Sequence, residues 1–188
     1  VTLSKEIVGV DVEYNGNVVK GYTGDLKWYR TDTDEEVTGL QTTITYQGTG
    51  GTQYNSTEAP TNAGTYQAVF GIKSTEGYAA ISTAVEFTIQ KATISLKDVS
   101  WQETTTFTYD GTTHSVVLQN VPDMVNVTYG GNVEMSAVGN YTTTATFSVK
   151  DNQNYELVDY SIDACSWSIN ARETTMVTLS KEVVGVDA

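Results

Sequence analysis

The run VTLSKEIVGVD at residues 1–11 returns as VTLSKEVVGVD at residues 177–187, and the two copies differ only where Ile7 is replaced by Val183. Nearly the whole chain is therefore one period of a repeat. A match of this fidelity predicts one unit of a tandem array that is followed, over 177–188, by the first strand of the next unit. β-branched residues dominate the run, which favours a β-strand.

The composition indicates a folded, all-β protein. The chain has 188 residues, of which 39% are hydrophobic and 18% are charged, values typical of globular rather than disordered proteins. Threonine, tyrosine, valine, asparagine and glycine are abundant, whereas leucine, lysine and arginine are scarce. No stretch keeps the apolar spacing of a helix for more than about two turns.

The net charge and the single cysteine limit which partners the chain can bind and in which compartment it is expected. A net charge of −13 argues against nucleic acid, because phosphate contacts need clustered lysine and arginine. No signal peptide or spanning apolar run is present, so we expect no membrane insertion by this segment. Cys165 alone excludes an internal disulfide. These features are compatible with an extracellular protein of a bacterial cell surface.

A second, weaker repeat divides the chain into two halves. Four short motifs recur in the same order, which predicts two homologous domains at 1–91 and 92–176. Relative to the second domain, the first carries insertions at 26–37 and 48–60, where we expect loops or an added hairpin. The recurring motifs are residues 14–16 and 109–111, 44–46 and 127–129, 63–66 and 138–141, and 87–92 and 167–172.

The strand patterns favour an immunoglobulin-like β-sandwich for each domain. Apolar or small residues alternate with polar ones over 141–149 and over 66–72, so each segment has one buried and one solvated face. Short strands separated by turns are typical of such sandwiches. Lys91 and Ala92 join the domains without a Gly/Ser spacer, and we therefore expect a stiff connection.

The motifs Thr61–Tyr66 (TNAGTY) and Phe87–Ala92 (FTIQKA), with the Tyr-Asn/Asp-Gly turn, resemble the MBG/YDG-type repeats of bacterial surface and adhesin-like proteins. The resemblance covers nearly the whole chain, although the second domain departs from it at Val138–Tyr141 and at Arg172. It implies an immunoglobulin-like module of stalks and adhesins, and it implies no catalysis.

The residues that carry most enzymatic chemistry are sparse. His114 is the only histidine and is expected to open a strand over 115–118, with no nucleophile elbow in the sequence. One histidine and one cysteine do not make a zinc site. Cys165 shares a face with Trp167 and Ile169, which indicates a small buried hydrophobic side chain. We expect no enzyme and no cofactor.

The insertions of the first domain offer two candidate ligand sites. The acidic run at 32–36 supplies oxygen ligands for calcium but lacks the spacing of an EF-hand, so a solvated hairpin tip is the alternative. Trp28, Tyr29 and Tyr54, with Tyr78, could stack on a sugar. Aromatic rings in strand-rich modules also serve as core or cross-strand pairs. Exposed rings would favour glycan or protein binding, and buried rings a spacer.

The repeated strand supports a hypothesis of assembly. The end strand of one molecule could occupy the first-strand position of a neighbouring copy and give fibres, whereas in a continuous array it would simply begin the next domain. Lysine–asparagine isopeptide cross-links are a further possibility in such modules. The assembly residues are Val1, Leu3 and Ile7 in the first copy and Val177, Leu179 and Val183 in the second. The favoured function is a rigid structural repeat of an extracellular stalk, filament or adhesin.

Overall fold

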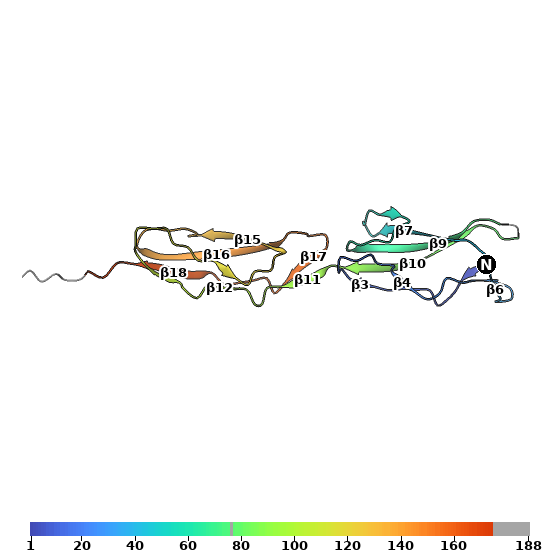
Figure 1. Ribbon diagram of the computed structural model, residues 1–188, viewed down its shortest axis with the longest axis horizontal. Helices are drawn as coiled ribbons and strands as arrows, with labels where there is room; N and C mark the ends of the chain where they lie inside the picture. The colour runs from blue at the N-terminus through green and yellow to red at the C-terminus, as the bar shows by residue number, and fades with distance from the viewer. Residues whose placement is uncertain (76, 175–188) are drawn as a thin grey trace, which may run out of the picture. The chain divides into compact units, whose positions relative to one another are not determined.

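The computed structural model describes residues 1–75 and 77–174, and these residues form strands and turns but no helix (Figure 1). The prediction of an all-β fold is therefore confirmed. The chain divides into two compact units that are interleaved in sequence. The first unit contains Val1–Leu96, Pro122–Asn126 and Ser148–Tyr160, and the second contains Lys97–Val121, Val127–Phe147 and the segment from Ser161. The domain limits inferred from the motifs stay a prediction.

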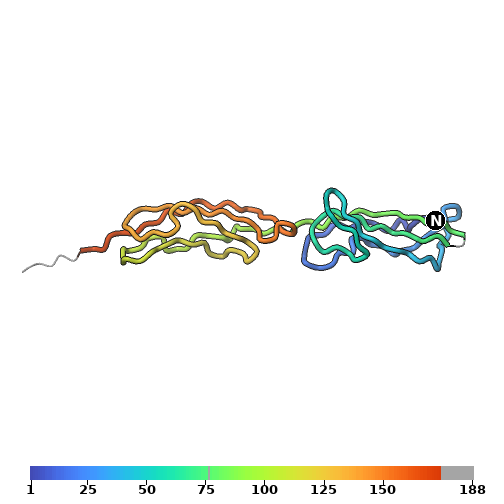
Figure 2. Tube along the Cα trace, turned by 90° about the horizontal axis from the view of Figure 1, so that it is seen from above, coloured from blue at the N-terminus to red at the C-terminus, as the bar shows by residue number. Residues whose placement is uncertain are grey.

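The main sheet of the first unit has five strands in the order β3-β10-β9-β7-β8. Its centre is antiparallel, with β9 (Gly64–Ile72) between β10 (Ile81–Gln90) and β7 (Thr42–Thr49). At one edge β3 (Val12–Glu13) joins β10 in parallel, and at the other edge β8 (Asn55–Ser56) joins β7. Figure 2 shows the first residues of the chain, in blue, running beside β10.

The central strand β9 follows the alternation that the sequence predicts. Tyr66, Ala68, Phe70 and Ile72 are all buried, and the residues between them are only partly buried. Because successive side chains of a strand point to opposite faces, these four place one face of the sheet against the core. The predicted buried face of this strand is confirmed.

Short strands from the first 37 residues cover that face. β1 (Thr2–Leu3), β5 (Trp28–Tyr29) and β6 (Glu36–Val37) form a three-stranded sheet. A second ladder joins β2 (Val8–Gly9) to β4 (Tyr22–Thr23). The core of the unit lies between this layer and the main sheet; its buried members from the covering layer are Leu3, Ile7, Tyr22 and Trp28.

A later part of the chain completes the first unit. β11 (Ala92–Ser95) pairs in parallel with β17 (Tyr155–Val158). The turn before β17 presents Asn154, which is 5% exposed. Its Oδ1 accepts a hydrogen bond of 2.8 Å from the backbone N–H of Ala63, and its Nδ2 donates to Asp151 Oδ2 at 2.8 Å. A buried amide with both ends bonded fixes this turn against the start of β9.

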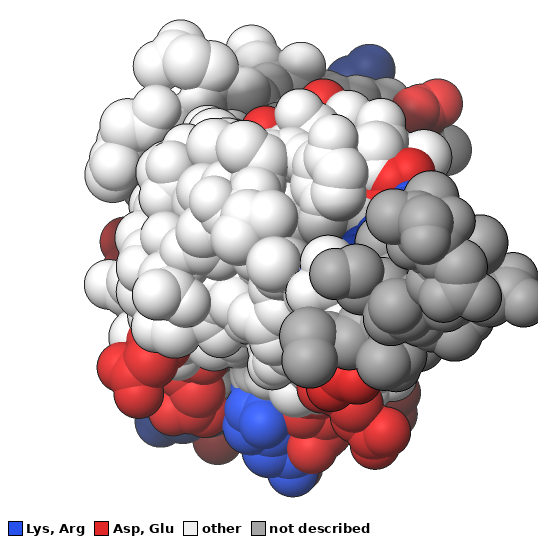
Figure 3. Space-filling view, turned by 90° about the vertical axis from the view of Figure 1, so that its left-hand side faces the viewer, with Lys and Arg blue, Asp and Glu red and all other residues white. Residues whose placement is uncertain are grey.

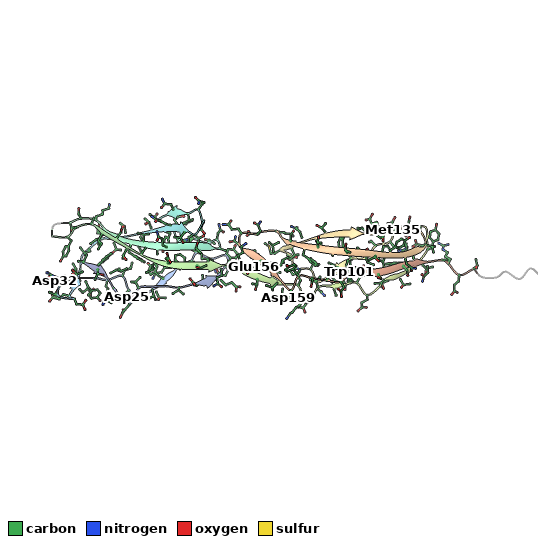
Figure 4. The ribbon with its side chains drawn as sticks, turned by 180° about the vertical axis from the view of Figure 1, so that it is seen from behind. Asp25, Asp32, Trp101, Met135, Glu156 and Asp159 are labelled. Carbon is green, nitrogen blue, oxygen red and sulfur yellow. The ribbon has the colours of Figure 1, made fainter. Side chains whose placement is uncertain are left out.

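The second unit is built around a sheet in the order β13-β18-β16-β15. β16 (Gly139–Val149) is antiparallel to β18 (Cys165–Asn170), and β13 (Thr106–Thr108) joins β18 in parallel. β15 (Val125–Gly131) completes the sheet. A separate pair, β12 (Ser100–Trp101) with β14 (Leu118–Gln119), carries Trp101, which Figure 4 labels with Met135.

The core of the second unit consists of Val116, Cys165, Trp167 and Ile169, against which Phe107 and Tyr141, among others, pack. Cys165, Trp167 and Ile169 alternate with more exposed residues along β18, as the sequence predicts. The expected strand over 115–118 is corrected: the strand is β14 at 118–119, whereas His114 forms an isolated bridge with Met135. Val116 turns inward before the strand begins.

The two units share local structures at matching motifs. In the first unit, the hydroxyl of Tyr66 donates to the carbonyl of Asn62 at 2.8 Å. In the second, the hydroxyl of Tyr141 donates to the carbonyl of Ala137 at 2.6 Å. Each tyrosine lies two residues after the glycine that begins its strand, and each returns to a carbonyl four residues upstream. This arrangement is known as a tyrosine corner.

The turns that follow the parallel edge strands β3 and β13 also match. The backbone N–H of Tyr14 donates to the carbonyl of Gln90 at 2.8 Å, and that of Tyr109 donates to Asn170 at 2.8 Å. The next residue in each case, Asn15 or Asp110, accepts a backbone hydrogen bond two residues on. Such Asx turns are made by short polar side chains that bond to nearby backbone.

Candidate functional site

The predicted sugar platform is not a single exposed surface. Trp28 is 3% exposed and belongs to the core of the first unit. Its indole Nε1–H donates to Thr42 Oγ1 at 2.8 Å, so the polar edge of the ring is also engaged. A buried ring with a bonded N–H has no free face for a ligand.

The two tyrosines of that platform lie in different segments, Tyr29 on β5 and Tyr54 just before β8. Tyr29 is partly buried on β5 and pairs with Thr2. Tyr54 packs edge-on against Tyr66, with ring centroids 5.6 Å apart, and donates its hydroxyl to the carbonyl of Glu58 at 2.9 Å. Trp28 and Tyr29 are thus neighbours on β5, whereas Tyr54 lies in the turn before β8 and packs on Tyr66.

The fourth aromatic residue, Tyr78, borders a surface hollow of about 420 Å³. Arg30 and Asp32 line the same hollow and form a forked ion pair, with hydrogen bonds of 3.0 and 2.7 Å. The Arg30 hydrogen bond lowers the pKa of Asp32 to about 2, and Asp32 in turn raises the pKa of Arg30. The hollow therefore combines the Tyr78 ring with the charged Arg30–Asp32 pair, and these groups can contact a polar ligand.

The acidic run at 32–36 forms the exposed tip of the β5–β6 hairpin, where Figure 4 labels Asp32. Two of its carboxylates face cations: Asp32 faces Arg30, and Glu36 is 3.3 Å from Lys27 Nζ. Within the described part of the chain, no three histidine, cysteine or acidic side chains gather as metal ligands. Calcium binding stays a prediction, which a rise of melting temperature on adding calcium would test.

His114 and Cys165 have structural surroundings. The ring of His114 stacks on Phe107 with centroids 4.6 Å apart, and its Nε2 lies 3.1 Å from Asp110 Oδ1. The hydroxyl of Thr112 is the main cause that lowers the pKa of Asp110 to about 2. Cys165 is 6% exposed, and burial raises the pKa of its thiol, which disfavours the reactive thiolate.

The surface lysines bear on the isopeptide possibility. Such a cross-link would be expected to hold its lysine in the protein interior, shielded from water. The candidates are all exposed, so their present positions do not favour a cross-link. These residues are Lys5, Lys20, Lys91, Lys97 and Lys150.

Charge is unevenly distributed on the surface that Figure 3 presents. Uncharged residues occupy most of this face, while Asp and Glu gather with a few basic residues along its lower edge. With a net charge of −13, the chain offers acidic rather than basic surface. Phosphate backbones are repelled by such a surface.

The first eleven residues make the most specific set of contacts among the predicted site residues. Leu3 and Ile7 are 8% and 6% exposed and enter the core, and Val1 is half-buried. Ser4 is 8% exposed, and its backbone N–H donates to the carbonyl of Lys27 at 2.8 Å. The second copies, Val177, Leu179 and Val183, lie outside the described residues.

Two further residues of this segment escaped the sequence prediction. Gly9 passes so close to β10 that a Cβ atom would lie 1.8 Å from the carbonyl oxygen of Glu86. Asp11 Oδ1 accepts a hydrogen bond of 2.7 Å from the backbone N–H of Thr88. Both residues recur in the second copy of the repeat, and this recurrence could have drawn attention to them. Only the structure shows the reason, which is that each of them contacts the backbone of β10.

No helix of the described residues is both long and apolar enough to cross a membrane. Comparisons of the chain with family models, with curated proteins and with solved structures gave no match.

Proposed function

We propose that this chain is a non-catalytic structural repeat of an extracellular bacterial stalk, filament or adhesin, and that it acts as a rigid spacer. It would consist of tandem immunoglobulin-like sandwich domains of the MBG/YDG type. The observation that carries the proposal is the recurrence of one architecture. In the main sheet of each unit, a short edge strand pairs in parallel with a second strand, and the other neighbour of that second strand begins with a tyrosine corner.

This recurrence supports duplication of one module. The parallel pairs are β3 with β10 and β13 with β18, and the corner tyrosines lie on the neighbouring strands β9 and β16. Immunoglobulin-like domains combine a sandwich of this kind with a tyrosine corner. Modules that repeat within a chain build long assemblies in which each repeat contacts its neighbours.

The position of the aromatic side chains also supports a structural role. Tyr22 meets Phe70 edge-on at 4.8 Å, and Tyr66 stacks on Phe87 at 5.5 Å. Pairs of this geometry add roughly 0.5–1.5 kcal/mol each beyond the burial of their area. The first unit therefore uses its rings to stabilise its core, as a structural module would.

Small-angle X-ray scattering of chains with one, two and three copies of residues 1–176 tests the spacer role. A rigid spacer adds a constant length for each copy, whereas flexibly joined copies extend by a decreasing increment. The control places a Gly/Ser linker of about 15 residues between copies, which should abolish the constant increment. Equal behaviour of the direct and linked chains would contradict the spacer role.

The alternative function is an adhesive module that binds glycan or protein through the loops of the first unit. The hollow beside Tyr78 favours it, because a ring and the Arg30–Asp32 pair meet there. A glycan array would test it with Tyr78→Ala, and Tyr160→Ala would be the matched control because that ring is 63% exposed elsewhere. Binding lost only with Tyr78→Ala would favour the adhesive function, and absence of binding would favour the spacer.

A further inference from the structure

We propose that residues 177–187 of one molecule bind the first-strand slot of a second copy. The first-strand slot is the surface of the first unit that residues 1–11 contact, formed by β4, β5 and the outer edge of β10. The inference stands on the repeated sequence and on these contacts. It holds or fails separately from the spacer role, because assembly and stiffness are measured independently.

The apolar contacts of the slot are met by the second copy. Leu3 and Ile7 are the two apolar side chains of the segment that are buried in the core. The repeat carries Leu179 and Val183 at the same spacing. Leucine is kept, and the change of isoleucine to valine removes one methylene while keeping the branched shape that suits a strand.

The polar contacts are met as well. Ser4 donates its N–H to Lys27, and its Oγ accepts the N–H of Glu6 at 3.2 Å, which shapes the bend after β1. The carboxylate of Asp11 accepts a hydrogen bond from the backbone N–H of Thr88. The side chain thus takes the place that the carbonyl of a paired strand would have. The repeat has serine at 180 and aspartate at 187, so both contacts can be remade.

The steric requirement of the slot is the most selective one. At Gly9 a Cβ atom would lie 1.8 Å from the carbonyl oxygen of Glu86 and 2.9 Å from its carbon. Both are backbone atoms of β10, which cannot yield as a flexible side chain would. Only glycine fits without moving the strands apart, and the repeat has Gly185 at this position.

The slot is also one that a second chain can enter. Residues 1–11 are held by two ladders of two residues each, β1 with β5 and β2 with β4, and β1 is at the edge of its sheet. Edge strands are the elements that exchange between molecules. Because the donor segment and the slot are different surfaces, such exchange gives open, head-to-tail chains.

The molecule's own first segment competes with the incoming one. A tethered segment acts at an effective concentration of about millimolar, so wild-type chains at micromolar concentration should remain mostly monomeric. The missing methylene adds a preference of roughly 2- to 10-fold for residues 1–11 over 177–187. A change that weakens only the first copy should therefore release the slot and permit assembly.

The repeat supplies a matched pair of variants in the full chain. Leu3→Asp weakens the binding of residues 1–11 to their own slot and leaves residues 177–187 unchanged. Leu179→Asp weakens residues 177–187 and leaves residues 1–11 unchanged. Sedimentation velocity between about 5 and 200 µM, a range below the effective concentration of the tether, should show a concentration-dependent ladder for Leu3→Asp alone. Leu179→Asp and the double variant should remain monomers. A ladder in the double variant would overturn the proposal, because assembly would not use residues 177–187.

A labelled peptide with the sequence of residues 177–187 gives a second measurement, by fluorescence anisotropy. It should bind Leu3→Asp and the milder Leu3→Ala, and the peptide change Val183→Ile should tighten binding roughly 2- to 10-fold. The peptide change Gly185→Val should abolish it. If Leu3→Asp does not fold alone, the wild-type peptide should restore its near-UV circular dichroism. Binding of a 1–11 peptide without binding of the 177–187 peptide would overturn the proposal.

Discussion

Replacing each corner tyrosine by phenylalanine tests whether the two units rely on the same local structure. Tyr66→Phe removes a hydroxyl that donates to Asn62 from a ring that is 2% exposed. We expect a loss of about 1–2 kcal/mol of unfolding free energy, the net worth of a hydrogen bond plus partial desolvation of its acceptor. Tyr141→Phe removes an equivalent but more exposed bond, and we expect about 0.5 kcal/mol.

Urea unfolding followed by the amide resonances of each unit measures both effects separately. Tyr66→Phe should lower the midpoint of the first unit, and Tyr141→Phe that of the second. The control is Tyr54→Phe, whose hydroxyl bonds to Glu58 at the exposed surface and should contribute less than about 0.5 kcal/mol. If Tyr66→Phe proved no more costly than Tyr54→Phe, the corner would not be the stabilising element that the matching geometry indicates.

Three further predictions concern buried bonds and acid stability. Thr143→Val should cost the second unit about 2 kcal/mol in urea unfolding, because it leaves the buried indole N–H of Trp167 without its acceptor at 2.9 Å. Asn154→Ala should lower the unfolding free energy of the first unit by about 2 kcal/mol, because the N–H of Ala63 loses its partner. The pKa of Asp110 is lowered from 3.8 to about 2, so its contribution is present above pH 4 and is lost as pH falls through 2; Asp110→Asn should flatten stability over that window.

Controls for these variants lie beside them in the chain. Thr144→Val changes the exposed face of β16 and should leave the urea midpoint nearly unchanged. Asn152→Ala keeps the backbone carbonyl that accepts from Lys91, so it should cost much less than Asn154→Ala. An equal loss in a variant and its control would contradict the bonding that the structure assigns.

The sequence predicted the long strands because their signal is local. In β16, Thr143 and its alternate neighbours face inward while Thr142 and Thr144 face water, as a period of two requires. The same holds for β9 and for Cys165 on β18. In these segments the pattern of burial is written in consecutive residues, and no knowledge of distant contacts is needed.

The short strands and the aromatic residues were less accessible for a physical reason. A strand of two residues, such as β5, has no period to detect, and only its partners reveal that Trp28 faces inward. A tryptophan in an insertion is equally compatible with a ligand platform. The grouping of 148–160 with the first unit rests on contacts between residues far apart in sequence, such as the β11–β17 ladder and the hydrogen bond between Asn154 and Ala63, 91 residues away.

The residues that are identical in the two copies of the repeated strand fall into two groups, those that the slot requires and those that it does not. The slot explains why Leu3 and Gly9 recur, because one is buried and the other has no room for a side chain. It does not explain the recurrence of exposed residues such as Lys5, which agrees instead with the proposed duplication of a repeat unit. The one difference, Ile7 against Val183, falls on a buried position, and a lost methylene there costs about 0.5–1.5 kcal/mol. The fold thus favours its own first strand over an incoming copy, while every other requirement of the slot is kept in the second copy.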